Sequence, residues 1–297
     1  MLMQLPQQRL NNQKRNFLYM CKIAILTNHD PKQLEALINS LWLNFSKTEY
    51  DGYGASWIMP NGKLATLKSS LPQARGDSLP SFVNGFYELN GELKSNGGAL
   101  LVHGRTATCG VNLANCHPMQ SGQSALIHNG VVRSHYYKNS RATSCDSELI
   151  LNAWKHGVRS GNSLENVAKN IEGYYAFSIL TASKSGEILD VVRDDQASLY
   201  VGSKNSGYCF ATTREAVEIC GGKFLGEFTK NIHAQFINGV CVKTSGFKPY
   251  VAPARDYTFE RQASRAFSDY KPYSYERELL PEETDEDLYT DAKLQGL

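Results

Sequence analysis

The apolar positions that follow residue 21 predict a buried strand and then a long helix. Lys22–Thr27 is a short, mainly apolar run of the kind that forms a buried strand. Asp30 and Pro31 have the order of a helix N-cap and a first helical residue. The next apolar residues recur at the spacing of one helix face: Leu34, Leu37, Ile38, Leu41 and Phe45. We therefore expect a helix that begins at Pro31 and ends near Phe45.

Short apolar runs recur through the middle of the chain. Asn61-Gly62 and Asn238-Gly239 are strong signals for β-hairpin turns. The runs that predict strands are Ala55–Met59, Lys63–Leu67, Ala99–His103, Ala125–His128, Tyr174–Thr181, Glu187–Arg193, Ser198–Val201 and Tyr208–Ala211. Helices are predicted from Ser144 to Trp154, after Ser163, and over Arg214–Cys220. Strands that cluster around hairpins, with helices between the clusters, indicate an α+β domain.

Two stretches lack a regular pattern. Residues 69–97 are rich in Ser, Gly, Asn and Pro, so we expect a loop with a short helix around Ser81–Leu89. From Pro249 onward, tyrosines lie among charges and prolines. We therefore predict that residues 249–297 form a Tyr-rich, acidic C-terminal tail.

The charge of the chain is nearly balanced overall but unevenly distributed. The 297 residues include 31 Lys and Arg against 29 Asp and Glu, a net charge of +2. Residues 1–20 carry three basic residues and no acid, whereas residues 276–297 carry eight acids and two bases. This balance gives no global field towards nucleic acid or an acidic membrane, and no apolar stretch is long enough to span a bilayer. We expect neither partner.

Seven cysteines at irregular spacing argue against a disulfide framework in a chain of this length. Cys116-His117 near Cys109 fits no common zinc spacing, so we expect no metal and no cofactor. The N-terminal segment has no proper apolar region followed by a small-residue cleavage site. A reducing, cytoplasmic location is therefore expected.

Four short segments place reactive or charged side chains next to predicted elements. Met20-Cys21 lies directly before the first strand. His103–Gly110 (HGRTATCG) and Ile127–Val131 (IHNGV) coincide with the ends of two other predicted strands. Ser144–Glu148 (SCDSE) lies at a predicted helix start. Each segment alone has an ordinary interpretation as a surface ion pair, a turn or a helix cap, so the argument depends on their combination and order.

In this order the segments resemble the class II glutamine amidotransferases, whose catalytic domain is an N-terminal-nucleophile (Ntn) hydrolase. Further similar segments are Glu49–Gly54, Asn115–Pro118, Arg193-Asp194, Leu199–Gly202 and Phe210–Thr212. The resemblance implies a domain over residues 21–248 with the fold of this superfamily, a four-layer αββα sandwich with two mainly antiparallel sheets. Asp51–Gly54 is similar to a run found in stand-alone relatives, which favours a stand-alone amidotransferase domain.

The resemblance implies that the chain hydrolyses L-glutamine to glutamate and ammonia. Cys21 would attack the amide carbon and form a γ-glutamyl thioester. Its own α-amine would carry the proton, because an α-amine with a pKa near ~8 suits neutral pH. The Asn129 side-chain amide and the Gly130 backbone N–H would stabilise the negative charge on the former carbonyl oxygen.

The resemblance also implies a pocket for the amino-acid end of glutamine. Arg105 would bind the α-carboxylate as a planar bidentate donor, and Asp146 would bind the α-ammonium. Backbone groups around Thr108 and Gly130 would complete this pocket. His103, His117 and Cys109 are expected to have packing or hydrogen-bonding roles instead.

The segment before Cys21 is the main departure from the family. With residues 1–20 attached, Cys21 has no free α-amine to act as the base. We expect either translation from Met20 or removal of a propeptide leader of residues 1–20. A chain that keeps the leader would be a zymogen or inactive.

The synthase domain that most family members carry has no counterpart in the sequence. Only the predicted tail of residues 249–297 follows the domain. The ammonia would therefore be released or passed to a separate synthase subunit. Two alternatives stay open: a hydrolase of the same fold that acts on another γ-glutamyl amide, and a catalytically inactive binding or structural protein that retains the fold.

Overall fold

The computed structural model describes residues 21–49, 51–70, 93–133, 142–159, 161, 163–204 and 207–250. Three of the predicted segments lie outside these residues: the leader of residues 1–20, the helix around Ser81–Leu89, and the tail from residue 251 onward. The predicted domain boundaries at residues 20 and 248 stay predictions.

A seven-stranded antiparallel sheet forms one half of the described part. Its strand order is β11-β9-β10-β1-β4-β2-β3. The strands are β1 (Lys22–Leu26), β2 (Tyr53–Ile58), β3 (Leu64–Ser69), β4 (Leu100–Gly104), β9 (Tyr200–Lys204), β10 (Gly207–Ala211) and β11 (Lys223–Glu227). β1 lies in the middle, where its register with β4 places Lys22 opposite Gly104. Cys21 and Arg105 are the next residues beyond this pair, so they adjoin at one end of the sheet.

A six-stranded antiparallel sheet forms the other half, in the order β13-β12-β8-β7-β6-β5. The strands are β5 (Met119–Ser121), β6 (Ser124–Val132), β7 (Gly173–Ser183), β8 (Gly186–Arg193), β12 (Ile232–Ile237) and β13 (Val240–Gly246). β6 faces β1 and β4 across the interior of the molecule. The segment Ile127–Val131 and the segment His103–Gly110 therefore come from different sheets.

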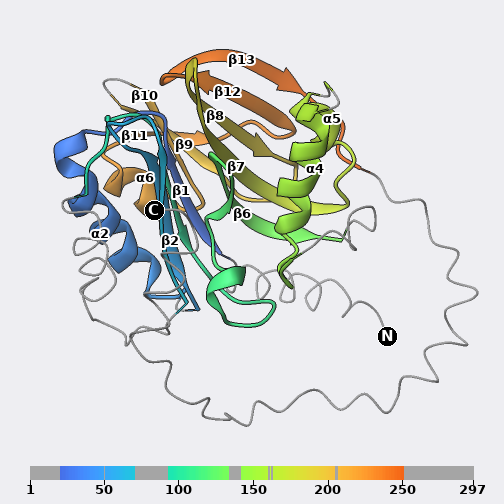
Figure 1. Ribbon diagram of the computed structural model, residues 1–297, viewed down its shortest axis with the longest axis horizontal. Coiled ribbons are helices and arrows are strands. Elements are labelled where there is room, and N and C mark those ends of the chain that lie inside the picture. The colour runs from blue at the N-terminus through green and yellow to red at the C-terminus, as the bar shows by residue number, and fades with distance from the viewer. Residues whose placement is uncertain are drawn as a thin grey trace, which may run out of the picture. The chain divides into compact units, whose positions relative to one another are not determined.

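Four layers result from the way helices cover the outer faces of the two sheets (Figure 1). α2 (Leu34–Phe45) and α6 (Arg214–Ile219) pack on the seven-stranded sheet, and α4 (Glu148–Arg159) and α5 (Leu164–Ala168) pack on the six-stranded sheet. A third apolar cluster, with Ile23, Leu101 and Ile127 among its members, fills the space between the sheets. This is the αββα sandwich that the family resemblance predicts.

The first predicted helix is confirmed, but it begins differently from the prediction. The Asp30 side chain accepts a hydrogen bond from the Lys32 backbone N–H at 3.0 Å, and so caps a short 3-10 turn, η1 (Pro31–Gln33). α2 starts only at Leu34, and Gln33 forms no side-chain cap. The apolar face is as predicted, with Ile38, Leu41 and Phe45 buried.

The prediction for the helix at Ser144 is wrong at both ends. α4 starts at Glu148, because the Glu148 carboxylate accepts hydrogen bonds from the backbone N–H groups of Ala142 and Thr143 at 2.9 and 2.7 Å. The Ser144 hydroxyl instead accepts from the Asn115 side-chain amide at 2.9 Å. The helix also continues past the expected stop at Gly157.

β6 is longer than its predicted strand and includes both residues predicted for the oxyanion hole. The sequence predicted a strand that ends at His128 and placed Asn129 and Gly130 after it. In the structure Asn129 and Gly130 pair with Ala176 and Tyr175 of β7. Gly130 has a φ of +145°, and a Cβ atom there would lie 2.1 Å from the Tyr174 carbonyl oxygen. Only glycine fits this position, because the backbone of β7 occupies the space of a side chain.

Candidate functional site

Cys21 lies directly before β1 and beside the segment that follows β4. Its thiol donates a hydrogen bond to the Thr106 carbonyl oxygen, with the two atoms 3.5 Å apart. The side chain is half-buried. The strand register thus joins two segments that are 85 residues apart in the chain, the predicted nucleophile and the loop of Arg105.

The environment of Cys21 keeps its thiol protonated. Burial raises the pKa of this thiol to about 12, and the carboxylates of Glu49 and Asp146 act in the same direction, whereas Arg105 opposes them. At neutral pH the group is therefore a thiol and not a thiolate. Such a nucleophile needs a base that removes its proton while the new sulfur–carbon bond forms.

The neighbouring Lys22 is already engaged in an ion pair. Its Nζ atom lies 2.9 Å from Glu49 Oε2 and 2.5 Å from Thr48 Oγ1. Glu49 is buried, and Thr48 also donates a hydrogen bond to its carboxylate. Since this ammonium group is the partner of a buried carboxylate, Lys22 is a poor candidate for the base.

Arg105 is a buried cation that is held by backbone carbonyl groups. Its side chain is 2% exposed, and its Nη2 atom donates to the carbonyl oxygens of Gly110 at 3.0 Å and Cys109 at 3.3 Å. Nη1 approaches the Asp51 carbonyl oxygen at 3.5 Å. Among the described residues, no carboxylate forms an ion pair with Arg105. A buried guanidinium with neutral partners retains its attraction for an anion.

Asp51 fixes the loop that carries Arg105. Its Oδ2 atom accepts a hydrogen bond from the Ala107 backbone N–H at 2.7 Å. Two backbone hydrogen bonds extend the pairing, from Asp51 N–H to the Arg105 carbonyl at 3.1 Å and from Arg105 N–H to the Gly52 carbonyl at 2.8 Å. The sequence pattern marked Asp51 only as typical of stand-alone relatives, and in the structure its carboxylate holds this loop.

Asn129 is buried on β6 with part of its amide unsatisfied. The residue is 1% exposed, and its Oδ1 atom has no hydrogen-bond partner among the described residues. Such an atom costs stability, so a native structure retains it for a reason. An oxyanion would need the Nδ2 donor of this amide, so the unpaired Oδ1 acceptor does not by itself support the oxyanion role.

One hydrogen bond connects the two sheets beside these residues. His103 Nε2 on β4 lies 3.1 Å from the His128 carbonyl oxygen on β6. His103 precedes Arg105 by two residues, and His128 directly precedes Asn129. The contact thereby sets the position of the predicted oxyanion residues relative to the predicted carboxylate-binding residue.

The three histidines in this region are buried and neutral. Burial lowers the pKa of His103 to about 3, and it also lowers the pKa values of His117 and His128. The rings of His103 and His117 stack with their centroids 4.2 Å apart. These properties agree with the packing roles expected for His103 and His117.

Asp146 lies in the turn between β6 and α4. Its Oδ2 atom accepts a hydrogen bond from the Val132 backbone N–H at 2.6 Å. The next residue, Ser147, has its hydroxyl 2.8 Å from His128 Nδ1. Both contacts hold the turn against β6. The Asp146 carboxylate then lies close enough for its charge to act on the Cys21 thiol.

Thr108 differs from the other predicted site residues because it is exposed. Its side chain makes no hydrogen bond to another described residue, so the structure gives it no positioning contact. Its neighbour Cys109, which the sequence analysis assigned to packing, is instead 3.3 Å from Arg105 through its sulfur atom. The spacing of four residues from Arg105 was the only sequence signal for this contact.

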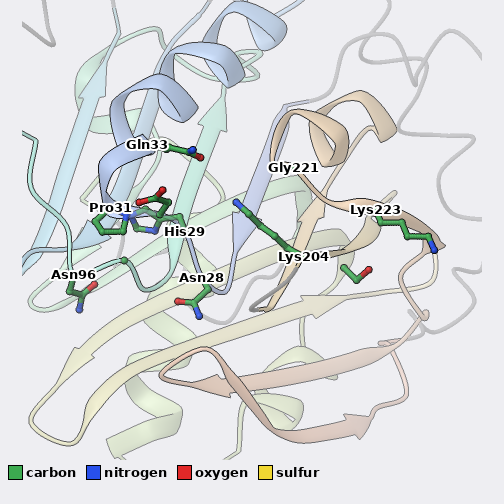
Figure 2. Close-up of a pocket in the computed structure, with 11 residues that line it drawn as sticks. Asn28, His29, Pro31, Gln33, Asn96, Lys204, Gly221 and Lys223 are labelled. Carbon is green, nitrogen blue, oxygen red and sulfur yellow. The ribbon is translucent and has the colours of Figure 1, made fainter.

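A separate cavity of about 620 Å³ opens at the opposite end of β1 (Figure 2). Its walls include Asn28, His29 and Asn96, with Lys204 and Lys223 on the other side. The two lysines come from β9 and β11. This cavity contains none of the predicted site residues, so size alone does not identify the candidate site.

Neither a metal centre nor a membrane span is found in the described ranges. No group of three or more His, Cys, Asp or Glu side chains there is arranged to hold a metal ion. No helix of that part of the chain is long and apolar enough to cross a membrane.

Comparison with known sequences finds distant relatives. No family model matches the chain. It is 26% identical over 172 residues to the glutamine–fructose-6-phosphate aminotransferase (isomerizing) of Geobacillus kaustophilus, and 26% identical over 161 residues to that of Zymomonas mobilis. These matches cover 50% and 49% of this chain but 28% and 25% of the relatives. The chain thus spans about a quarter of the length of the curated relatives it matches.

Comparison with solved structures finds the same fold. The glutamine phosphoribosylpyrophosphate amidotransferase of Bacillus subtilis matches with a TM-score of 0.57 and 23% identity, over 77% of this chain and 49% of that one. An allosteric regulatory enzyme of purine biosynthesis matches with a TM-score of 0.59 and 24% identity, over the same shares. The chain therefore has the fold of these amidotransferase structures, and its sequence is similar to two glutamine–fructose-6-phosphate aminotransferases, in agreement with the resemblance of its motifs.

Proposed function

We propose that this chain hydrolyses L-glutamine to glutamate and ammonia through a thioester at Cys21. The observation that carries the proposal is that Cys21 adjoins the Arg105 loop, through the β1–β4 register and the hydrogen bond to Thr106, while the charges of Arg105 and Asp146 both act on its thiol. A thiol near one cation and one carboxylate suits an α-amino acid that carries a side-chain amide. The relatives named above, which use glutamine according to their names, support the same substrate.

The charges around Cys21 orient the substrate. The α-carboxylate of glutamine binds the Arg105 guanidinium, whose partners in the structure are backbone carbonyl groups and the Cys109 sulfur. The α-ammonium binds Asp146, whose carboxylate accepts hydrogen bonds from the Val132 backbone N–H and the Cys145 thiol. With the head group held at both charges, the γ-amide is directed to the Cys21 sulfur.

The covalent steps then follow from the groups near the sulfur. Cys21 attacks the γ-carbonyl carbon while its proton moves to its own α-amine. The oxyanion receives hydrogen bonds from the Asn129 side chain and the Gly130 backbone, each worth about 3 kcal/mol of barrier. Collapse of the tetrahedral intermediate releases ammonia, which takes the proton, and water hydrolyses the γ-glutamyl thioester to glutamate.

The proposed base requires a free amine at Cys21. We propose that the active form begins at Cys21, after removal of residues 1–20 or after initiation at Met20. The pKa of about 12 for the Cys21 thiol supports the need for a base, and the ion pair of Lys22 leaves the α-amine as the better candidate.

The test is glutamate release from glutamine by the full chain and by a chain that begins at Cys21. We expect turnover by the shorter chain and none by its Cys21→Ala variant. Cys220→Ala is the matched control, because Cys220 is buried in the α2–α6 layer and should retain turnover. Equal rates for wild type and Cys21→Ala would contradict the proposal, and intact mass of the active species reports whether the leader is absent.

The ammonia acceptor lies outside residues 21–248 in this proposal. The relatives named above carry an acceptor in their names, fructose 6-phosphate in one case and phosphoribosyl pyrophosphate in another. A separate synthase subunit would play this part here. Glutamine turnover that rises when a co-purified protein is added back would support such a partner.

A reducing compartment, such as the cytoplasm, suits the proposed chemistry. All seven cysteines are free in the structure, including the exposed Cys241. A catalytic thiol also needs to remain reduced in order to act as a nucleophile.

A further inference from the structure

The cavity at the opposite end of β1 from Cys21 has walls that are polar almost throughout. Apart from Pro31 and two glycines, every described residue that lines this space of about 620 Å³ has a polar side chain. The volume lies within the range of ligand pockets, about 300–1,000 Å³, but most such pockets are lined mainly by apolar groups. A wall of this composition favours a hydrophilic ligand, because an apolar ligand would leave the polar groups without hydrogen-bond partners.

The cavity contains an ammonium group that has no carboxylate partner. Lys204, at the end of β9, is half-buried, and within the described part of the chain it takes part in no ion pair. By contrast, Lys22 and Lys243 each pair with a glutamate, at 2.9 and 2.6 Å. Figure 2 shows that the Lys204 side chain extends towards Gln33 on the facing wall. An ammonium group in this position can bind an anion.

The wall around Lys204 holds its side chain without neutralising it. Gly221 lies against it, since a Cβ atom at that glycine would be 3.7 Å from Lys204 Cε and 3.8 Å from Nζ. Both ring nitrogens of His29 form hydrogen bonds within the protein. Burial lowers the pKa of His29, and the Lys204 charge acts in the same direction. His29 is therefore neutral at pH 7, and the positive charge beside it is that of Lys204.

The other charged groups of the wall favour a phosphate over a carboxylate. Lys223 on β11 adds a second ammonium group, which points away from Lys204 in Figure 2. Asp30 adds one carboxylate, which is exposed and accepts a hydrogen bond from the Lys32 backbone N–H at 3.0 Å. The described wall thus has a net positive charge and no planar guanidinium to match a carboxylate. A phosphate monoester, with a charge of about −1.5 to −2 at pH 7, suits two point charges better.

Amide side chains provide neutral contacts in the same cavity. The Oδ1 atom of Asn96 accepts a hydrogen bond from the Gly98 backbone N–H at 3.0 Å, which leaves its Nδ2 group to donate. Gln33 forms no side-chain cap at the start of α2, and its amide lies on the wall that Lys204 faces. An amide both donates to and accepts from a hydroxyl group. We therefore expect hydroxyl groups on the ligand next to its phosphate.

We propose that this cavity binds a phosphate monoester of a polyhydroxylated compound, at a site that does not depend on glutamine hydrolysis at Cys21. The phosphate lies at Lys204, and hydroxyl groups of the ligand contact Gln33 and Asn96. The chain then has two ligands, one at each end of β1.

The first experiment is calorimetry of the full chain with glucose 6-phosphate as the probe. We expect saturable binding, and binding of glucose or inorganic phosphate that is at least about tenfold weaker, because each lacks one half of the probe. Lys204→Gln should weaken binding of the probe about tenfold, or about 1.4 kcal/mol, whereas Lys204→Arg should retain most of the affinity. Lys169→Gln, at an exposed lysine after α5, is the matched control and should bind like wild type.

Three results of this titration would overturn the proposal: no saturable binding of glucose 6-phosphate, equal affinity for glucose or inorganic phosphate, and unchanged affinity in Lys204→Gln. The second experiment locates the ligand in the wild-type chain and so needs no variant to fold. Lysines are acetylated with acetic anhydride and read by mass spectrometry. Glucose 6-phosphate should slow acetylation of Lys204 and leave Lys169 unaffected. Absent protection at Lys204, or equal protection at both lysines, would exclude the site.

Discussion

The two ends of β1 differ in how their buried polar groups are satisfied. At the Cys21 end, several buried atoms have no partner within the described residues: His103 Nδ1, Thr106 Oγ1, Asn115 Oδ1, His128 Nε2, Asn129 Oδ1 and both ring nitrogens of His117. The other end of this five-residue strand lies ~17 Å away. There, both ring nitrogens of His29 form hydrogen bonds, one with the Ser95 hydroxyl and one with the Gly98 carbonyl.

The cavity lies at the satisfied end and the candidate site at the unsatisfied end. Asn96 bonds to the Gly98 N–H, and Ser95 bonds to the Gly97 N–H, so the wall of the cavity is built from complete local turns. Evolution tolerates unpaired buried atoms where a ligand or reaction needs them. Between these two ends, we expect the unsatisfied polar groups, rather than the volume of the cavity, to mark the candidate site.

The largest effect should come from the amide in β6. Asn129→Ala should lower kcat for glutamine about 100- to 1000-fold, because it removes a donor to the oxyanion. Steady-state glutamate release measures the loss. Asn96→Ala, an amide at the satisfied end, is the control and should keep kcat within about twofold. Equal losses in both variants would erase the distinction between the two ends.

A smaller effect should follow from Arg105→Lys. This variant keeps the charge but loses the planar pair of donors, so KM for glutamine should rise about 10- to 100-fold. Arg214→Lys, on an exposed ion pair with Glu218, should leave KM unchanged. An unchanged KM in Arg105→Lys would remove Arg105 from carboxylate binding.

At the satisfied end the effect should be on stability and not on rate. His29→Ala leaves the Ser95 hydroxyl and the Gly98 carbonyl without their partner, which should lower the free energy of unfolding by about 1–2 kcal/mol. Urea denaturation measures this change, and kcat of the folded variant should stay the same. A large loss of kcat would show that both ends take part in catalysis.

The smallest effect is a pH dependence of stability from another satisfied histidine. Burial alone would lower the pKa of His233, but hydrogen bonds to Asp190 and Glu165 at 2.8 and 2.9 Å raise it above its usual value. A raised pKa in the folded state stabilises the protein fully below about pH 6.5, and this contribution is lost as the pH rises through the folded pKa.

A pKa difference of one between the folded and unfolded states changes the free energy of unfolding by about 1.4 kcal/mol. Urea unfolding of the wild type at several pH values should therefore show a fall in the free energy of unfolding as the pH rises above 6.5. The same series with His233→Gln should show little of this fall. The buried histidines near Cys21 should contribute nothing to that fall, since their pKa values are lowered. A profile that His233→Gln leaves unchanged would assign the dependence to other groups.

Local signals predicted much of the fold. The Asn61-Gly62 turn determines the β2–β3 hairpin through its own backbone preference, and the structure confirms it with a φ of +78° at Gly62. β11 was not predicted, because its alternating half-exposed residues gain their strand character from pairing with distant β9. The start of α4 was mispredicted because the Ser144 hydroxyl does not cap the helix. It accepts a hydrogen bond from the side chain of Asn115, which lies 29 residues earlier in the chain.

The motifs predicted the members of the site, but not their contacts. A match to a family motif marks Arg105 and Asp146 as residues of interest, and the structure brings both near Cys21. The contact of Cys109 with Arg105 lies in a loop held by Asp51, and the spacing of four residues between them does not by itself predict it. Pairing between distant segments therefore limits what sequence alone could predict here.

The hydrogen bond from His103 to the His128 carbonyl makes the candidate site a product of tertiary assembly. The proposed nucleophile and the Arg105 guanidinium come with one sheet, and the proposed oxyanion donors come with the other. Neither half of the sandwich holds a complete set of groups, so a stable fragment with either sheet alone would be inert towards glutamine. We therefore expect glutamine turnover only from molecules in which the two sheets have packed together. The rate of turnover then reports how many molecules have completed this packing.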